Sequence, residues 1–166
     1  AYAFTSVLNS PIDRSDEVID AADLTVMLDQ ALAALVEATG TKGGGVFLVD
    51  DNNPDGELLV RAASGVSTHT LGPAPSLRDF LAERPKNPDG SPVALTEAVR
   101  VIGRRLLVPL VFRNHPLGLL VLLLSSEDMP EPALVEFMRQ AAAQLAIAVS
   151  NARAYTRVTQ LASELR

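Results

Sequence analysis

The sequence predicts an α+β fold. Three observations predict it: a one-sided helical pattern begins near Asp23, two pairs of apolar runs are separated by turns, and a second one-sided helical pattern follows Pro132. Apolar runs that follow one another through short turns pair as antiparallel hairpins, and helices segregated from them pack on the sheet as a second layer. A chain of 166 residues is long enough for one such domain.

The first helix is expected between Asp23 and Gly40. Asp23 is a typical N-cap residue, and glycine commonly follows the last turn of a helix. Between them, apolar residues recur at spacings of three and four, the period of a helix that buries one face. They are Leu24, Met27, Leu28, Ala31, Leu32, Leu35 and Val36. Residues 12–22 are expected to form a short acidic helical lead.

The first hairpin is expected between residues 43 and 63. Gly43–Gly45 is not followed by the Gly-Lys-Ser/Thr of a phosphate-binding loop and precedes a strand pattern, so we interpret it as a plain loop. The strand 46–49 then ends in the turn 50–56, which is rich in Asp, Asn and Gly. Residues 57–63 are its antiparallel partner.

Residues 64–103 are the least regular part of the chain and are rich in Gly and Pro. We expect a short helix at 77–83 and a short strand near 93–95 within a long excursion over one face of the sheet. Long excursions of this kind often carry function.

The last hairpin comprises two runs, 105–112 and 117–124, that are apolar almost throughout. Such strands must be covered on both faces. The turn 113–116 carries an arginine and a histidine and would be very costly in a bilayer, so the two runs form a hairpin and no membrane contact is expected. Pro130 and Pro132 open the closing helix. Its core stripe comprises Leu134, Phe137, Met138, Ala141, Leu145, Ala148 and Val149.

Composition excludes several classes of function. The chain has no Cys, which rules out disulfides, zinc-thiolate sites and cysteine nucleophiles and favours a cytoplasmic location. Its net charge is −6, and its basic residues are scattered singly, so nucleic-acid binding is not expected. No nucleophile–base pair or cluster of metal ligands stands out, and we assign neither catalytic nor metal-binding residues.

The second half of the chain resembles the C-terminal half of a GAF domain. The resemblance rests on Val108-Pro109-Leu110 in an apolar strand, the return strand that begins Leu117-Gly118-Leu119, and the helix that closes on Asn151-Ala152-Arg153-Ala154-Tyr155. It implies a central antiparallel sheet of five or six strands, with the N- and C-terminal helices on one face and the irregular crossover roofing a pocket on the other.

The resemblance also implies an organisation and a role. Residues 1–166 form a single GAF-like domain with a core at about 23–152 and a signalling-helix extension at 153–166. Such a module senses a small ligand or partner and relays the signal through its terminal helix to an output domain in the same polypeptide, as in histidine kinases of two-component systems. The alternatives are a ligand-free GAF domain that serves only for dimerisation and, disfavoured, a small-molecule enzyme.

Any pocket is expected between the sheet and the Ser64–Gly103 excursion. Its candidate lining residues are Arg61, His69, Leu77, Phe80, Leu81 and Arg104. An arginine on or beside a strand either pairs with an acid at the sheet edge or meets an anionic ligand. Strand alternation places Arg61 with Ala63 on one face, but it does not say whether that face meets the excursion.

The ligand itself is not identified by the sequence. Without Cys, neither a covalently bound bilin nor the thiol chemistry of free methionine sulfoxide reductases is available to this chain. The Asn-Lys-Phe-Asp-Glu set of cyclic-nucleotide-binding GAF domains is missing. Haem would need His69 or His115, and we expect both to be exposed to solvent, so haem binding is not expected.

The closing helix changes the phase of its apolar stripe after Val149. From there, positions advance by four and three alternately, the heptad spacing of a coiled coil. The candidate seam comprises Asn151, Ala154, Val158, Leu161 and Leu165. A parallel homodimer through the terminal helices is expected, with Asn151 favouring in-register pairing; the alternative is a frayed, solvated tail.

Overall fold

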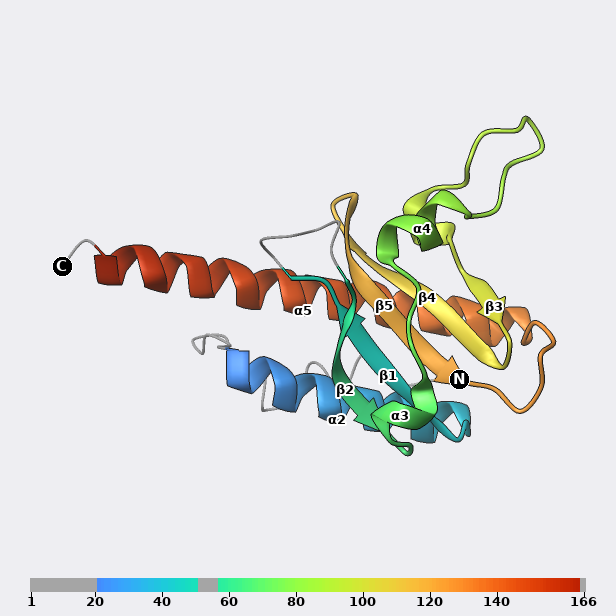
Figure 1. Cartoon of the computed structure of the whole chain (residues 1–166), viewed down its shortest axis with the longest axis horizontal. Coiled ribbons are helices and arrows are strands. Elements are labelled where there is room, and N and C mark those ends of the chain that lie inside the picture. Colours follow the sequence, from blue (N-terminus) through green and yellow to red (C-terminus); the bar gives the residue numbers. More distant parts are fainter. Residues whose placement is uncertain (1–20, 51–56, 165–166) are drawn as a thin grey trace.

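A computed structural model describes residues 21–50 and 57–164 (Figure 1). The expected α+β class is confirmed: helices pack on an antiparallel sheet of five strands. The elements in chain order are α2 (Ala21–Thr39), β1 (Gly43–Leu48), β2 (Leu59–Ser64), α3 (Thr68–Leu71), α4 (Leu77–Ala82), the 3-10 helix η1 (Leu95–Glu97), β3 (Arg100–Ile102), β4 (Arg105–Phe112), β5 (His115–Leu123) and α5 (Pro132–Glu164).

The sheet has the strand order β2-β1-β5-β4-β3, and every neighbouring pair is antiparallel. The two hairpins expected from the sequence therefore meet in the middle of the sheet, where β1 pairs with β5. β1 is buried throughout, β4 at all but its two end residues, and β5 from Gly118 to Leu122, which explains why their sequences are apolar instead of alternating.

Both long helices pack on one face of this sheet, as Figure 1 shows for α2 and α5. Leu28, Leu32 and Leu35 of α2 and Met138, Leu145 and Val149 of α5 are fully shielded from solvent. On the sheet side, the cluster is completed by Val46, Leu106, Val108, Leu110, Leu120 and Leu122. These alternate residues of β4 and β5 all lie on the helix side because successive side chains of a strand point to opposite faces.

The interpretation of Gly43–Gly45 as a loop was wrong, because these residues form the first half of β1. A Cβ on Gly43 would lie 2.6 Å from the carbonyl oxygen of Ser64, and one on Gly44 would lie 2.5 Å from that of Val121. The neighbouring strands thus approach β1 so closely that only glycine fits, one of the recognised uses of glycine inside a strand.

The crossover contains a different set of short elements from the one expected. The helix at 77–83 is confirmed as α4, but the strand near 93–95 was wrong: the third strand is β3, and residues 95–97 form η1. The short helix α3 was not predicted from the sequence. The first helix, α2, begins at Ala21, so Asp23 lies in its first turn and is not its N-cap. The expected lead at 12–22 lies outside the described residues except for Ala21 and Ala22, which belong to α2.

Candidate functional site: the excursion face and the closing helix

The excursion covers the sheet face opposite the long helices. Phe80 and Leu77 of α4 and Leu71 of α3 are each 1% exposed. They form one cluster with Phe47, Leu107, Leu119 and Val121, the residues of β1, β4 and β5 that point away from the helices. In the described part of the chain, this face is therefore packed with the protein's own leucine and phenylalanine side chains.

Arginine side chains fix the excursion in place. Arg105 of β4 donates from Nη1 to the carbonyl of Pro73 at 2.8 Å and to that of Leu71 at 3.3 Å. Leu71 is the last residue of α3 and Pro73 lies just after it, so the guanidinium ties the end of that helix to the sheet. A charged donor makes such bonds stronger than those between neutral groups.

Arg100 and Arg84 complete this anchoring. Arg100 of β3 lies over the ring of Phe80 at 5.2 Å from its centroid and pairs with Glu83 at 3.4 Å. Arg84 donates to the carbonyls of Val93 and Leu81, each at 2.8 Å, and so closes the base of the loop that follows α4. The guanidinium groups of Arg84, Arg100 and Arg105 are therefore engaged with the protein itself.

The structure brings together three of the six residues expected to line a pocket. Leu77, Phe80 and Leu81 meet in the excursion-face cluster. His69 is exposed on α3, and Arg104 is exposed in the turn between β3 and β4. The sixth, Arg61, donates to Thr25 Oγ1 at 3.4 Å, so its guanidinium reaches α2 on the helix side of the sheet.

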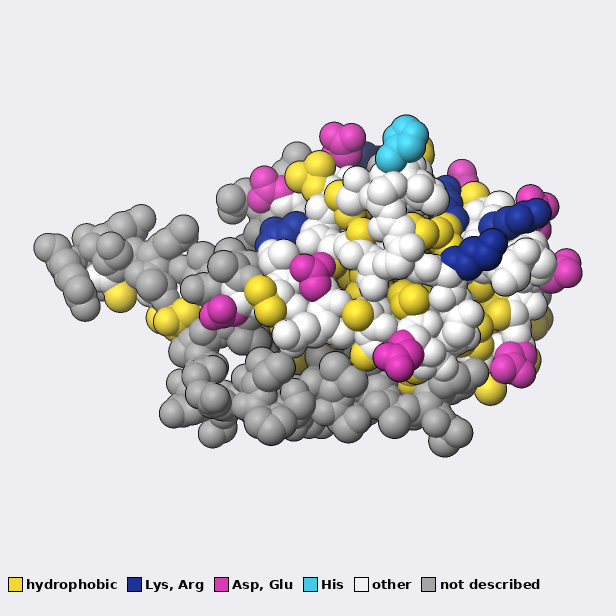
Figure 2. Space-filling model, turned by 90° about the horizontal axis from the view of Figure 1, so that it is seen from below, with side chains coloured by type: hydrophobic (Ala, Val, Ile, Leu, Met, Phe, Trp, Pro, Cys, Tyr) yellow, Lys and Arg dark blue, Asp and Glu magenta, His cyan; other side chains and the backbone are white. Residues whose placement is uncertain are grey.

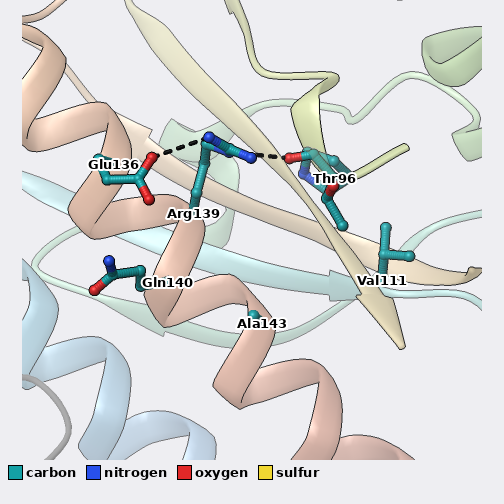
Figure 3. Close-up of a pocket in the computed structure, with 7 residues that line it drawn as sticks. Thr96, Val111, Glu136, Arg139, Gln140 and Ala143 are labelled. Atoms are coloured by element: carbon teal, nitrogen blue, oxygen red, sulfur yellow. Dashed lines mark hydrogen bonds and ion pairs between the residues drawn. The ribbon is translucent and has the colours of Figure 1, made fainter. Parts of the chain in front are cut away.

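A cavity of about 210 Å³, which no pattern in the sequence predicts, lies between η1, β4 and α5 (Figure 3). Arg139 crosses it and bonds to Glu136 Oε2 at 2.9 Å and to the carbonyl of Thr96 at 3.2 Å. Pro109 and Val111 of β4 and Gln140 and Ala143 of α5 complete its lining. Because β3 pairs only with residues 105–107, the outer edge of β4 beyond them is left to face this cavity.

The predicted seam lies on the solvent side of α5. Asn151 and Ala154 are exposed, Val158 is 63% exposed and Leu161 is 59% exposed, while Leu165 lies outside the described residues. Ala152 is the last residue of α5 whose side chain is described as buried. The helix then projects beyond the domain, with hydrophobic side chains uncovered on the rod at the left of Figure 2.

Charged and polar side chains lie outside the core in the described part of the chain. No polar or charged residue there is buried, and no group of three or more His, Asp or Glu side chains is placed to hold a metal ion. The pKa of Asp89 is lowered, chiefly because the hydroxyl of Ser91 donates to its carboxylate, but Asp89 lies in an exposed loop. Among the described helices, none is long and apolar enough to cross a membrane.

The comparison that decides the family is a match of residues 23–151 to the model of the GAF domain. The chain belongs to the GAF family. The match includes α2 from Asp23, the whole sheet, the excursion and α5 up to Asn151. GAF domains of this kind are sensory or regulatory modules of signalling proteins. No curated protein sequence matches the chain.

Solved GAF domains share the fold at low identity. The GAF domain of an Acinetobacter phosphoenolpyruvate-protein phosphotransferase is 18% identical, with a TM-score of 0.62 over 91% of this chain and 92% of that one. The phycoerythrobilin-bound GAF domain of a cyanobacterial phytochrome is 20% identical, with a TM-score of 0.60 over 94% and 99%. That of a putative sensor histidine kinase from Pseudomonas syringae pv. tomato is 17% identical, with a TM-score of 0.58 over 93% and 86%.

Proposed function

We propose that this GAF domain is a dimeric regulatory module of a signalling protein, which passes a change in the domain to an output domain through α5. The observation that carries the proposal is the division of α5 at Ala152. Before it, α5 is part of the core, and after it the helix continues with an exposed stripe at heptad spacing. If two copies paired in parallel along that stripe, their α5 helices would leave the two domains side by side.

The energetics favour pairing over a solvated tail. Full burial of a valine or leucine side chain stabilises by about 1.5–3 kcal/mol, and Val158 and Leu161 are both more than half exposed in the single chain. The seam is too short to pair by itself, so the domain surfaces must assist. Ile147, which is 46% exposed, extends this apolar stripe of α5 back onto the domain.

The packing of the sheet face beneath the excursion, where a ligand would bind, supports the ligand-free form of the proposal. Phe80, Leu77 and Leu71 occupy it, and three arginines hold the segment that carries them. Relatives with bound phycoerythrobilin or phycocyanobilin favour a second candidate, a ligand held under the excursion. In this chain such a ligand would be non-covalent, because there is no Cys, and it would have to displace Phe80.

Three further parts of the proposal come from the family and the composition. We propose that the module works in the cytoplasm, that its output domain lies in the same polypeptide as in sensor kinases, and that it has no catalysis of its own. These parts are supported by the family match, by the histidine kinase relative and by the absence of cysteine.

Sedimentation equilibrium tests the dimer. The chain is compared with the double variant Val158→Lys/Leu161→Lys and with a matched control, Leu59→Lys/Met129→Lys, which charges two equally exposed apolar residues away from the seam. We expect a dimer at tens of micromolar that the seam variant abolishes and the control retains. A monomeric parent chain, or a seam variant that still dimerises, would refute the proposed seam.

Native mass spectrometry and an absorbance spectrum of the purified chain test the second candidate. If the domain is ligand-free, we expect the purified protein to have the mass of two polypeptides and no absorption band in the visible range. A retained small molecule that is lost when Phe80→Trp fills the face further would favour the ligand-binding function instead.

A further inference from the structure

Val49, the residue that follows β1, connects the two sides of the sheet. Its side chain is 3% exposed and belongs to the excursion-face cluster with Phe47 and Leu58. Its N–H donates to the carbonyl of Leu117 at 3.0 Å, which extends the pairing of β1 with β5. Its carbonyl accepts a hydrogen bond from Nη2 of Arg153 on α5. One residue thus contacts the excursion face, the central strands and the closing helix.

Arg153 occupies the position at which α5 leaves the domain. Ala152, immediately before it, is 2% exposed and packs in the helix-side cluster, whereas Ala154 is already exposed. Arg153 itself is half-buried. Its long side chain reaches back from α5 to the carbonyl of Val49, so it joins the helix at its exit to the end of a central strand.

The Val49 carbonyl needs this partner. Val49 is buried, and a buried main-chain carbonyl that loses its hydrogen bond carries the full cost of desolvation. Movement of Val49 with the cluster under the excursion would therefore pull on Arg153, and displacement of Arg153 would leave the carbonyl unpaired. This hydrogen bond therefore connects a residue of the excursion-face cluster to the exit of α5.

We propose that the Arg153–Val49 contact couples the packing under the excursion to the exit of α5, and that Arg153 is the positioning residue for the signalling helix. The inference rests on the proposed function of α5 as the relay. It names the two residues through which a change in the packing of the sheet face reaches the helix. The same contact would act whether that change begins with ligand binding or with a rearrangement of α4.

Amide hydrogen exchange of residues 153–158 measures the exit of the helix. We expect Arg153→Gln to speed their exchange about tenfold, because the helix loses its tether to a buried carbonyl. Arg153→Lys, which retains a charged donor, should restore part of the protection. Arg, Lys and Gln have similar helix propensities, so propensity does not account for the difference.

Arg139→Gln is the matched control. Arg139 lies on the same helix and also donates to a main-chain carbonyl, that of Thr96, but at the opposite end of the domain. This variant should leave the exchange of residues 153–158 unchanged. Unchanged exchange in Arg153→Gln, or equal acceleration in Arg139→Gln, would overturn the proposal.

Coupling is tested with Phe80→Leu, which loosens the excursion-face cluster without emptying it. In the parent chain, we expect Phe80→Leu to speed amide exchange at residues 153–158 several-fold. In a chain that already carries Arg153→Gln, we expect Phe80→Leu to have no further effect on that exchange. Equal effects in both backgrounds, or none in either, would overturn the link. Sedimentation of the same samples reports the dimer separately, so failure of the proposed function is distinguishable from failure of the coupling.

Discussion

Arg61 of β2 reaches Thr25 of α2, with Nη2 3.4 Å from Oγ1, although strand alternation assigns Arg61 to the same face as Ala63. The pairing of β1 with β2 explains the difference. Val46 pairs with Ala62 and Phe47 pairs with Val60, which leaves Arg61 as the extra residue of a β-bulge. A bulge interrupts alternation locally, and here Arg61 lies on the helix side with Ala62.

This relationship removes one argument for an anionic ligand. An arginine that projected into a pocket under the excursion would have favoured a phosphate or carboxylate there. Arg61 lies on the other side of the sheet, Arg104 is exposed in a turn, and Arg105 is bonded to the carbonyls of Leu71 and Pro73. The ligand-free proposal is consistent with these three placements.

Replacement of Arg105 should loosen the excursion. Arg105→Gln removes bonds from a charged donor to two carbonyls, so we expect the free energy of unfolding to fall by about 1–2 kcal/mol. Urea denaturation followed by circular dichroism measures the loss. The adjacent Arg104→Gln is the control: Arg104 is exposed, and its replacement should change stability by less than about 0.5 kcal/mol. Equal effects at the two positions would contradict the anchoring role.

Phe80 should be the most costly residue of the excursion to truncate. It is 1% exposed, and Phe→Ala in a core costs about 3–5 kcal/mol. Arg78→Ala, at an exposed position of the same helix, should cost less than about 0.5 kcal/mol. Thermal denaturation of both variants measures the difference.

The cavity left by Phe80→Ala provides a second readout. A dry cavity lined by leucines binds small apolar molecules, and a ligand that binds only the folded state raises Tm. Toluene should therefore raise the Tm of Phe80→Ala and leave that of the parent chain unchanged. If toluene also stabilised the parent chain, the excursion face would already contain an open apolar pocket.

The elements predicted well are those whose signal is local. The apolar runs 105–112 and 117–124 correspond to β4 and β5, and the helical period after Pro132 corresponds to α5. Their patterns are long and consistent, so a single sequence suffices. The packing of Leu77, Phe80 and Leu81 could be anticipated for the same reason, since the apolar residues of a short helix must meet the sheet it crosses.

The elements that were missed depend on neighbours distant in sequence. Gly43–Gly45 has the local preference of a loop, and only the close approach of Ser64 and Val121 makes glycine necessary in that strand. The bulge at Arg61 arises from a register shift between two strands. The main-chain carbonyl that Arg153 contacts lies more than a hundred residues earlier, a type of contact that residue patterns do not encode.

Haem should not bind tightly to this domain. His69 is exposed on α3, and the sheet face beneath the excursion is filled by leucine and phenylalanine side chains. Titration with hemin should give the broad absorption of non-specific association, unchanged in His69→Ala and in the control His115→Ala. A sharp Soret band that disappears only in His69→Ala would show an axial ligand that the packing does not predict.

In the loop that projects beyond α4, the hydrogen bonds from Ser91 to Asp89 should be complete at neutral pH and weaken only in acid. In this loop the hydroxyl and N–H of Ser91 donate to Asp89 Oδ1 at 2.6 and 2.9 Å. These bonds favour the carboxylate, chiefly through the hydroxyl, and hold the pKa of Asp89 below its ordinary value of 3.8. The pKa of Asp89 is therefore lower in the folded chain than in the unfolded chain. The stability that these two bonds contribute is complete above the pKa of the unfolded chain and is lost as pH falls through the pKa of the folded chain.

Ser91→Ala tests this relationship because it removes the hydroxyl bond and retains the main-chain bond. The pKa of Asp89, measured by NMR titration of its carboxyl carbon, should rise toward 3.8 without passing it. Ser67→Ala, which removes a serine that caps the separate helix α3, should leave that titration unchanged. If the pKa of Asp89 were the same in Ser91→Ala as in the parent chain, the loop would not be held by these bonds in solution.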